Sequence, residues 1–422
     1  MKQNLKNGNI RGAFLAVVAT LTLLASITSC PVQAQLWKKV KDRVKRTIEN
    51  KVTQKSEDVT NKTMDKAEVA IQGKKPADAG SGAVGGGQSS PSSISTPQAT
   101  VSDYRSYDFV PGDKIIFEPD IRQEADAELP ARFKLIKGNA EIQSYEGDKL
   151  LHLDKGARMI ISPLMSTENY LPAQFTVEFD MSYEVNDSYM RYVNYFDVDF
   201  QKSDKQFDAP LYQFRITSGS GCEWGDGGHI HLPESLARTL AADGSWHHIA
   251  IYINKNIGKV YIDQYRVAAS NTLATGAGKM AVGTDGRYGI KIKNFRLAAG
   301  GSDKYNKVVT DGKFITHGIL FDVAKATIKP QSAGTLNEVV KMMQAHPALR
   351  FEIDGHTDND GSDETNLKLS EERAAAVKKA LVQMGIAQDR LTTKGMGERQ
   401  PIDSNDTQEG KANNRRVEFI KI

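Results

Sequence analysis

Hydrophobic and polar positions divide the 422-residue chain into segments with different periodicities. The first is an apolar, uncharged run, "AFLAVVATLTLLASITS" at residues 13–29, which follows a basic start containing Lys2, Lys6 and Arg11. A basic start, a short apolar run and small residues after it are typical of an export signal. No later run is apolar for long enough to cross a bilayer. The pattern therefore predicts an exported protein that is not integral to a membrane.

Two cleavage sites compete within this signal. The small-x-small sequence Val32–Ala34 suits the general signal peptidase, which would remove a signal peptide of residues 1–34 and leave Gln35 first. The sequence "ITSC" resembles a bacterial lipobox and would leave a lipidated Cys30. Isoleucine is an imperfect start for a lipobox, so the first cut is preferred and lipidation of Cys30 is the alternative.

A helical segment and a linker follow. Residues 35–73 are highly charged and carry a thin apolar stripe at about every fourth position, which predicts an amphipathic helix. Its basic first half fits either a membrane-surface or coiled-coil helix or a solvated spacer, and the narrow stripe favours the spacer. Residues 74–102 are rich in Gly, Ser and Pro and predict a flexible linker, which would span on the order of 30 Å.

Residues 103–300 change to the alternation of period two that is typical of strands. "FTVEFDMSYEV" alternates apolar and polar positions, and "HIAIYINK" and "KVYIDQYRVAAS" flank a hairpin turn predicted at Asn256–Gly258. Short strands separated by Gly, Asp and Asn predict an all-β sandwich.

The last third of this segment also resembles a known fold. "DGSWHHIAIYINKNIGKVYIDQYRVA" and the later "IKIKNFRLA" are similar to the end of a concanavalin-like or laminin-G-like jelly roll. The resemblance implies that Trp246 packs at a strand start, and it departs from the family at Gln264, where Gly is usual. Domains of this fold often bind carbohydrate or protein, so a glycan ligand for the sandwich is an alternative function.

Residue chemistry in the sandwich gives little support to an enzyme or a metal site. His247 and His248 are neighbours on a strand, so their side chains point to opposite faces, and we expect surface or strand-end histidines. Glu178, Asp180 and Glu184 lack the arrangement of a glycoside hydrolase and are expected on a solvent face. The sequence predicts a protein that is not an enzyme and that holds no metal or cofactor.

From residue 303 to 422 strands alternate with helices. "ITHGILFDV", "RFEIDGH", "LTTKGMG" and "RRVEFIKI" are expected to be strands, and "QSAGTLNEVVKMMQAHP" and "NLKLSEERAAAVKKALVQMG" helices, the second ending at Gly385. This order predicts an α/β (βαβαββ) domain with its helices on one face of the sheet.

Four motifs in this stretch closely resemble the OmpA-like C-terminal domain, a peptidoglycan-associating module of Gram-negative envelopes. They are "ILFDVAKATIKP", "GHTDNDGSDETNLKLSEERAAAV", "GMGERQPI" and "NNRRVEF". The resemblance implies an envelope protein of the periplasm or outer membrane that binds the diaminopimelate side chain of the peptidoglycan stem peptide. The positions that match the family's pocket are Thr357, Asp358, Asn366, Arg373 and Arg415. The family's "FDxN" element here ends in Ala324, so one amide contact is expected to be missing.

The chemistry of two residues fits that ligand. The end of a diaminopimelate side chain carries an ammonium and a carboxylate on one carbon. The carboxylate of Asp358 can accept from the ammonium, and the guanidinium of Arg373 can donate two hydrogen bonds to the carboxylate. Arg373 lies four residues before Val377, which keeps it on the helix face that turns to the sheet. The alternative is that Asp358 and Arg373 form an ordinary ion pair with each other.

Composition limits the remaining function classes. The length suggests two or three domains, and the formal net charge of +3 is too small to indicate a nucleic-acid partner. The two cysteines, Cys30 and Cys222, cannot form a disulfide framework. The sequence therefore predicts a non-enzymatic envelope protein that binds peptidoglycan through its C-terminal domain. A surface or periplasmic glycan-binding adhesin with the same wall anchor is the alternative.

Overall fold

The computed structural model describes residues 107–155, 158–184, 195–207, 210–217, 221–224, 229–240, 244–284, 288–301 and 304–422. The chain divides into two compact units, Met1–Ile94 and Ser95–Ile422, and every described residue lies in the second. The predicted signal peptide, the lipidation site at Cys30, the helical segment 35–73 and the linker 74–102 lie outside the described residues and stay predictions. None of the described helices is long and apolar enough to cross a membrane.

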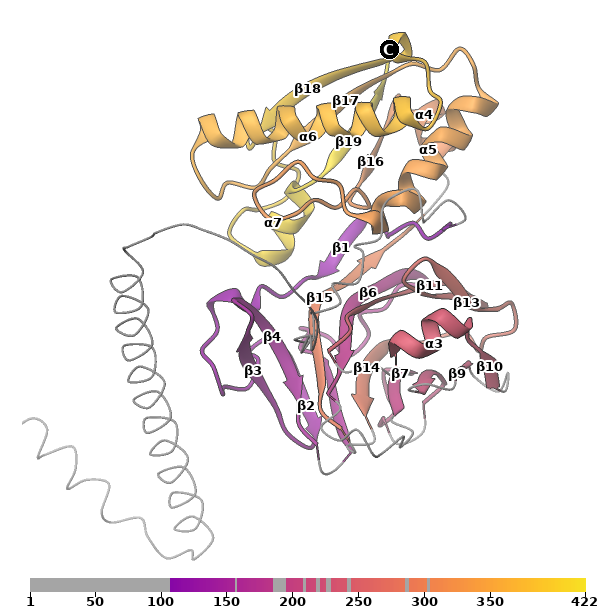
Figure 1. Cartoon of the computed structure of the whole chain (residues 1–422), viewed down its shortest axis with the longest axis vertical. Coiled ribbons are helices and arrows are strands. Elements are labelled where there is room, and N and C mark those ends of the chain that lie inside the picture. Colours follow the sequence, from indigo (N-terminus) through magenta and orange to yellow (C-terminus); the bar gives the residue numbers. More distant parts are fainter. Residues whose placement is uncertain are drawn as a thin grey trace, which may run out of the picture. The chain divides into compact units, whose positions relative to one another are not determined.

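Two antiparallel sheets form the first domain of this unit (Figure 1). One has the strand order β13-β12-β11-β6-β15-β4-β3, with β1 also paired to β15, and the other has the order β10-β9-β8-β7-β14-β5-β2. The strands are β1 (Lys114–Phe117), β2 (Phe133–Lys137), β3 (Ala140–Tyr145), β4 (Asp148–Leu153), β5 (Met159–Pro163), β6 (Gln174–Tyr183), β7 (Tyr195–Gln201), β8 (Tyr212–Thr217), β9 (Gly221–Trp224), β10 (His229–His231), β11 (His247–Asn254), β12 (Ile257–Ile262), β13 (Tyr265–Ser270), β14 (Lys279–Thr284) and β15 (Ile290–Ala299). The short helices η2 (Ile121–Gln123) and α3 (Glu234–Leu240) complete the domain.

The period-two pattern places the core between these sheets. Phe175, Val177 and Phe179 of β6 are fully buried in one apolar cluster with side chains from both sheets. The ring of Phe179 stacks on that of Phe295, with centroids 5.6 Å apart. The expected all-β sandwich is thus consistent with the observed sheets, whereas its jelly-roll or laminin-G relationship stays a prediction.

The hairpin turn predicted at Asn256–Gly258 is wrong in position. Asn254 pairs with Ile257, so the turn consists of Lys255 and Asn256, and the positive φ of 56° belongs to Lys255. Gly258 lies inside β12, where a Cβ would come within 2.4 Å of the Trp224 ring. Packing against that ring, and not turn geometry, explains the glycine.

A second turn, directly after Ile262, separates β12 from β13. Its left-handed residue is Asp263, with φ of 51°, which is followed by Gln264. Aspartate tolerates the left-handed region better than most residues. The turn therefore forms without a glycine at 264.

The outer face of β6 differs from the solvent face expected for it. Glu178 is only 3% exposed, and His247 and His248 are 4% and 7% exposed, so these histidines are buried and not on the surface. His248 Nδ1 lies 2.8 Å from Asp180 Oδ1, and His247 Nδ1 lies 2.7 Å from an oxygen of Asp263. The carboxylates compensate for burying these rings.

The C-terminal domain is a four-stranded sheet with the order β16-β19-β17-β18, in which only β17 and β18 are parallel. Figure 1 shows helix α6 lying across these strands. The elements are α4 (Lys304–Asp311), β16 (Lys313–Thr316), η3 (Pro330–Ser332), α5 (Ala333–Ala345), β17 (Phe351–His356), α6 (Asp363–Gln383), η4 (Gln388–Arg390), β18 (Leu391–Gly397), α7 (Gln408–Asn414) and β19 (Val417–Lys421).

The expected strands and helices of this domain are present, with one difference. "ITHGILFDV" is a strand only at its beginning, in β16, after which Phe321 forms an isolated bridge with Ile328. Ser362 caps α6 by accepting a hydrogen bond from the backbone N–H of Thr365, and Gly385 follows the helix end with a φ of 97°.

The sandwich and the C-terminal domain pack directly on each other. Phe109 and Tyr261 belong to an apolar cluster that also contains Ala333 of α5. The side chain of Asn413, in α7, accepts from the backbone N–H of Ile115 at 2.9 Å and donates to its carbonyl at 3.1 Å. An amide that meets both backbone groups of a strand residue continues the hydrogen bonding of that strand. These contacts bring the end of β1 close to the C-terminal domain.

Candidate functional site

Asp358 lies at the carboxyl end of β17, the edge where loops gather in α/β folds. The backbone N–H of the preceding Thr357 donates to the carbonyl of Gly397 at 2.9 Å, which fixes this loop to the end of β18. The Asp358 carboxylate is 7% exposed. Its Oδ1 accepts from the Asp360 N–H at 3.2 Å, and its Oδ2 accepts from Arg415 Nη1 at 2.6 Å. Asp358 is therefore held in one orientation by the fold.

Arg373 of α6 is held on two sides. Its Nε donates to the Lys325 carbonyl at 3.0 Å, and its guanidinium carbon lies 4.9 Å from the centroid of the Phe321 ring. Burial lowers the pKa of Arg373, and the positive charge of Arg415 lowers it further, while Asp358 opposes the shift. Among the described residues no carboxylate lies within ion-pair distance of Arg373. Its two terminal amino groups are thus available to an anion.

Asp358 and Arg373 do not form an ion pair with each other. The partner of Asp358 is Arg415, so the alternative of an ordinary Asp358–Arg373 pair is wrong for this structure. Both residues still act on one another electrostatically, because Asp358 contributes to the pKa of Arg373. The arrangement keeps a negative and a positive group near enough to interact electrostatically, without an ion pair between them. Such a pair can meet the two charges of a zwitterion.

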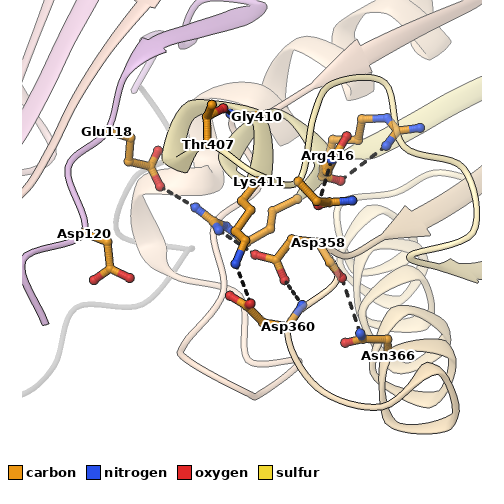
Figure 2. Close-up of polar contacts among 12 residues, drawn as sticks. Glu118, Asp120, Asp358, Asp360, Asn366, Thr407, Gly410, Lys411 and Arg416 are labelled. Atoms are coloured by element: carbon orange, nitrogen blue, oxygen red, sulfur yellow. Dashed lines mark hydrogen bonds and ion pairs between the residues drawn. The ribbon is translucent and has the colours of Figure 1, made fainter. Parts of the chain in front are cut away.

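Asn366 and Thr357 complete the predicted set. Asn366 is buried and donates its Nδ2 to the Asp358 carbonyl at 3.3 Å (Figure 2). It also donates to Glu398 at 2.6 Å, so it fixes the loop. The hydroxyl of Thr357 is buried, and no partner for it lies among the described residues. The structure therefore brings Asn366 and Arg415 each into contact with Asp358, next to Thr357, whereas Arg373 interacts with Asp358 only electrostatically.

The turn that contains Ala324 contacts Arg373 through its backbone. Ala324 is exposed and left-handed, with φ of 54°, and the turn around it is closed by the Lys325 N–H donating to the Asp322 carbonyl at 3.1 Å. This turn presents the Lys325 carbonyl to Arg373. A backbone acceptor thus fixes the guanidinium at this place.

Three further charged residues lie beside Asp358 that the sequence did not indicate as part of the site, namely Asp360, Lys411 and Glu118. Lys411 pairs with Asp360 at 2.6 Å, beside the Asp358 loop. Glu118 of the sandwich accepts from Arg415 Nη2 at 2.9 Å (Figure 2). Burial would raise the pKa of Glu118, but the charges of Arg296 and Arg415 outweigh it and lower this pKa to about 2. Nothing local in the sequence marks Glu118, because its role depends on how the domains pack.

The comparisons with known proteins cover this part of the chain. Residues 320–415 match the model of the OmpA family, so the chain carries an OmpA family domain there. Over 103 residues it is 41% identical to the "Probable lipoprotein YiaD" of Escherichia coli K12, covering 24% of this chain and 47% of that protein. Over 102 residues it is 43% identical to the "Peptidoglycan-binding protein ArfA" of Mycobacterium bovis, covering 24% of this chain and 31% of the relative.

A solved structure gives a match over the same portion of the chain. The peptidoglycan-associated lipoprotein from Burkholderia pseudomallei is 27% identical, with 25% of this chain and 88% of that chain covered and a TM-score of 0.24. The chain spans half or less of the length of the two curated relatives. What those whole proteins do is therefore considered only as a proposal for this one.

Metal binding has no candidate in the described ranges. No group of three or more His, Cys, Asp or Glu side chains there is arranged to hold a metal ion. Cys222 is buried in the sandwich core, and burial raises the pKa of its thiol to about 12, as the nearby Glu223 also does. The described cysteine is thus a packing residue and not a reactive one.

Proposed function

We propose that this chain is a non-enzymatic envelope protein that binds peptidoglycan through Asp358 and Arg373. In this proposal Asp358 accepts from the ammonium of a diaminopimelate side chain, and Arg373 donates to its carboxylate. Binding would tether the outer membrane or another envelope layer to the wall of a Gram-negative bacterium. The protein would then work in the periplasm or in association with the outer membrane.

The observation that carries the proposal is the free guanidinium of Arg373. Its orientation is fixed by Lys325 and Phe321, and its terminal amino groups face no described carboxylate. A partly buried cation without a counter-ion loses some of its hydration, and a bound carboxylate would compensate for that loss. The carboxylate of Asp358 nearby adds the second charge that a zwitterion needs. The printed name of ArfA, a peptidoglycan-binding protein, supports the same ligand class.

Sedimentation with purified diaminopimelate-type peptidoglycan tests the proposal. We expect the full exported chain to sediment with the wall and Asp358→Ala and Arg373→Ala each to weaken binding at least tenfold, since each would leave one ligand charge unpaired. Lysine-type peptidoglycan lacks the second carboxylate and should bind more weakly.

Asp389→Ala and Arg350→Ala are matched controls. These residues pair with each other at 2.9 Å and precede β18 and β17, so they lie at the opposite ends of the strands from Asp358. Both controls should sediment like the unchanged protein. The proposal is wrong if folded Asp358→Ala and Arg373→Ala bind as well as the controls.

Glycan capture by the sandwich remains the alternative function. Carboxylates that could bind a sugar lie on β7. Asp197 accepts from Arg215 of β8 at 2.7 Å, and Asp199 accepts from Gln213 of β8 at 2.5 Å. Each of these carboxylates already has a partner within the sheet. The described residues of this face therefore favour a structural role, and the wall-binding function is the one we propose.

A further inference from the structure

The peptidoglycan site receives one charged side chain from the sandwich. Glu118 follows β1, and its carboxylate joins two arginines from different domains. Oε2 accepts from Arg296 Nε on β15 at 2.6 Å, and Oε1 accepts from Arg415 Nη2 at 2.9 Å. With a pKa of about 2, caused by the two arginine charges acting against burial, Glu118 is ionised throughout the physiological range. It is thus a permanent negative charge beside the site.

Arg415 is divided between two carboxylates as a result. Its Nη1 donates to Asp358 and its Nη2 donates to Glu118. Arg296 is anchored in turn, because its Nη1 donates to the His317 carbonyl of the C-terminal domain at 3.2 Å. A row of alternating charges therefore runs from the sandwich into the ligand site and fixes the position of each member. Its order is Arg296, Glu118, Arg415 and Asp358.

The hydrogen-bond partners of Arg415 show what Glu118 changes. If Glu118 carried no charge, both amino groups of Arg415 could turn to Asp358, because a guanidinium and a carboxylate prefer a bidentate pair. A bidentate pair would fill a lone-pair site on each Asp358 oxygen, in addition to the Oδ1 site that the Asp360 N–H already fills, and would leave fewer sites for the ligand ammonium. With Glu118 in place, one amino group of Arg415 is occupied elsewhere.

The neighbouring residues of the sandwich support this arrangement. Asp120 donates its backbone N–H to Gln408 of α7 at 3.0 Å, which holds the segment against the C-terminal domain. Arg122 pairs with Asp120 at 2.6 Å. The negative charges of Asp358 and Asp360 help to raise the pKa of Arg122. Figure 2 shows Glu118 and Asp120 on the segment that follows β1, facing the loop that holds Asp358 and Asp360. The segment forms a rim of the site.

We propose that the sandwich completes the peptidoglycan site through Glu118. Glu118 is a positioning residue that holds Arg415 away from a bidentate pair with Asp358, so that Asp358 can accept from the ammonium of the ligand. This inference rests on the proposed function. It makes recognition of the ammonium, and not of the carboxylate, dependent on the docked sandwich.

Calorimetric titration of the full exported chain tests this role with two soluble probes. One is a stem tripeptide ending in diaminopimelate, and the other is the same peptide with its side-chain amine acetylated. The unchanged protein should prefer the free amine at least tenfold. Glu118→Gln, which keeps the size of the side chain but removes its charge and one of its two acceptor oxygens, should reduce that preference to threefold or less by weakening binding of the free-amine peptide.

The control variant is Glu409→Gln, which alters another contact between the domains. Glu409 pairs with Arg132 at 2.5 Å and contacts neither Asp358 nor Arg415. Circular dichroism checks that both variants are folded. Glu409→Gln should keep the full preference for the free amine.

Each outcome separates the two proposals. If Asp358→Ala binds like the unchanged protein, the proposed function itself fails. If Asp358→Ala loses binding but Glu118→Gln keeps the tenfold preference, the function stands and the role of Glu118 is wrong. If Glu118→Gln and Glu409→Gln lose the preference equally, docking alone matters and the positioning role of Glu118 is also wrong.

Discussion

His248 shows how a single buried side chain can make stability depend on pH. Its Nδ1 lies 2.8 Å from Asp180, and its Nε2 lies 3.7 Å from Glu178. Burial would lower the pKa of His248, but the hydrogen bonds and charges of Asp180 and Glu178 outweigh it and raise this pKa to about 9. The ring is therefore an imidazolium at neutral pH. Its positive charge compensates for the burial of the Asp180 and Glu178 carboxylates.

This raised pKa predicts a loss of stability in mild alkali. A folded-state pKa above the unfolded value of about 6.5 contributes stability that is fully present below pH 6.5 and disappears as the pH rises through about 9. The whole change would be on the order of 3 kcal/mol. Urea unfolding between pH 6 and pH 9.5 should show a falling midpoint, and His248→Asn should remove this part of the slope. An equal slope in both proteins would contradict the assignment.

At the residue scale the sequence indicated the ligand groups better than their partners. Asp358 and Arg373 could be predicted because short motifs contain them and because their chemistry suits a zwitterion. The pairing of Asp358 with Arg415 could not, since Arg415 lies in a separate motif and both arginines match positions of the same pocket. Glu118 could not be found at all, because only the packing of two domains places it beside Arg415.

At the scale of elements, the position of Arg373 depends on how closely α6 approaches β17. A Cβ on Gly355 of β17 would lie 2.3 Å from the Ser370 carbonyl of the helix backbone. Ser370 itself accepts from the Gly397 N–H at 2.9 Å through its hydroxyl. The glycine therefore permits a close helix–strand contact three residues before Arg373. This contact directs the start of α6 towards the loop that holds Asp358.

Gly355→Ala should weaken both the fold and the site. Backbone cannot yield to the new methyl group as a flexible side chain would, so we expect a loss of about 1–3 kcal/mol in the free energy of unfolding. Peptidoglycan sedimentation should fall with it, because α6 and Arg373 would move. Gly385→Ala is the control, since Gly385 has open space around it but a φ of 97°. Gly385→Ala should lower the free energy of unfolding by about 1 kcal/mol and leave binding unchanged. Equal binding by both variants would contradict the prediction.

Periodicity predicted most elements but not where turns and short strands end. The alternation of β6 and the helical repeat of α6 are long enough to be recognised, because each places its apolar side chains on one continuous face. The turn at Lys255 and Asn256 was misplaced because Gly258 resembled a turn residue, whereas contact with Trp224 accounts for it. The sequence predicts Glu178 in solvent, because alternation shows that a strand has two different faces but not whether the polar face is covered.

At the scale of the whole molecule, the docking of the sandwich on the C-terminal domain joins fold to function. Apolar contact around Phe109, the amide of Asn413 and the Glu118–Arg415 pair all connect parts far apart in sequence. Contacts of this kind depend on complementary surfaces, which the sequence of either domain does not reveal alone. The domain boundaries predicted at 303–422 and 103–300 stay predictions, as do the signal peptide and the lipid anchor at Cys30.

Gly334 of α5 gives the sharpest test of this docking. Alanine is a better helix former than glycine by roughly 0.5–1 kcal/mol, so the exchange would stabilise an isolated helix. In this chain, however, a Cβ at Gly334 would come within 1.8 Å of the Phe109 carbonyl oxygen. We therefore expect Gly334→Ala to displace Phe109 and to increase hydrogen exchange over 107–117, including the Ile115 amide that donates to Asn413.

Ala345→Gly, at the exposed end of the same helix, should lower helix stability without changing that exchange. If Gly334→Ala raises stability and leaves 107–117 protected, the domains are not docked in this way, and Glu118 could not then hold Arg415.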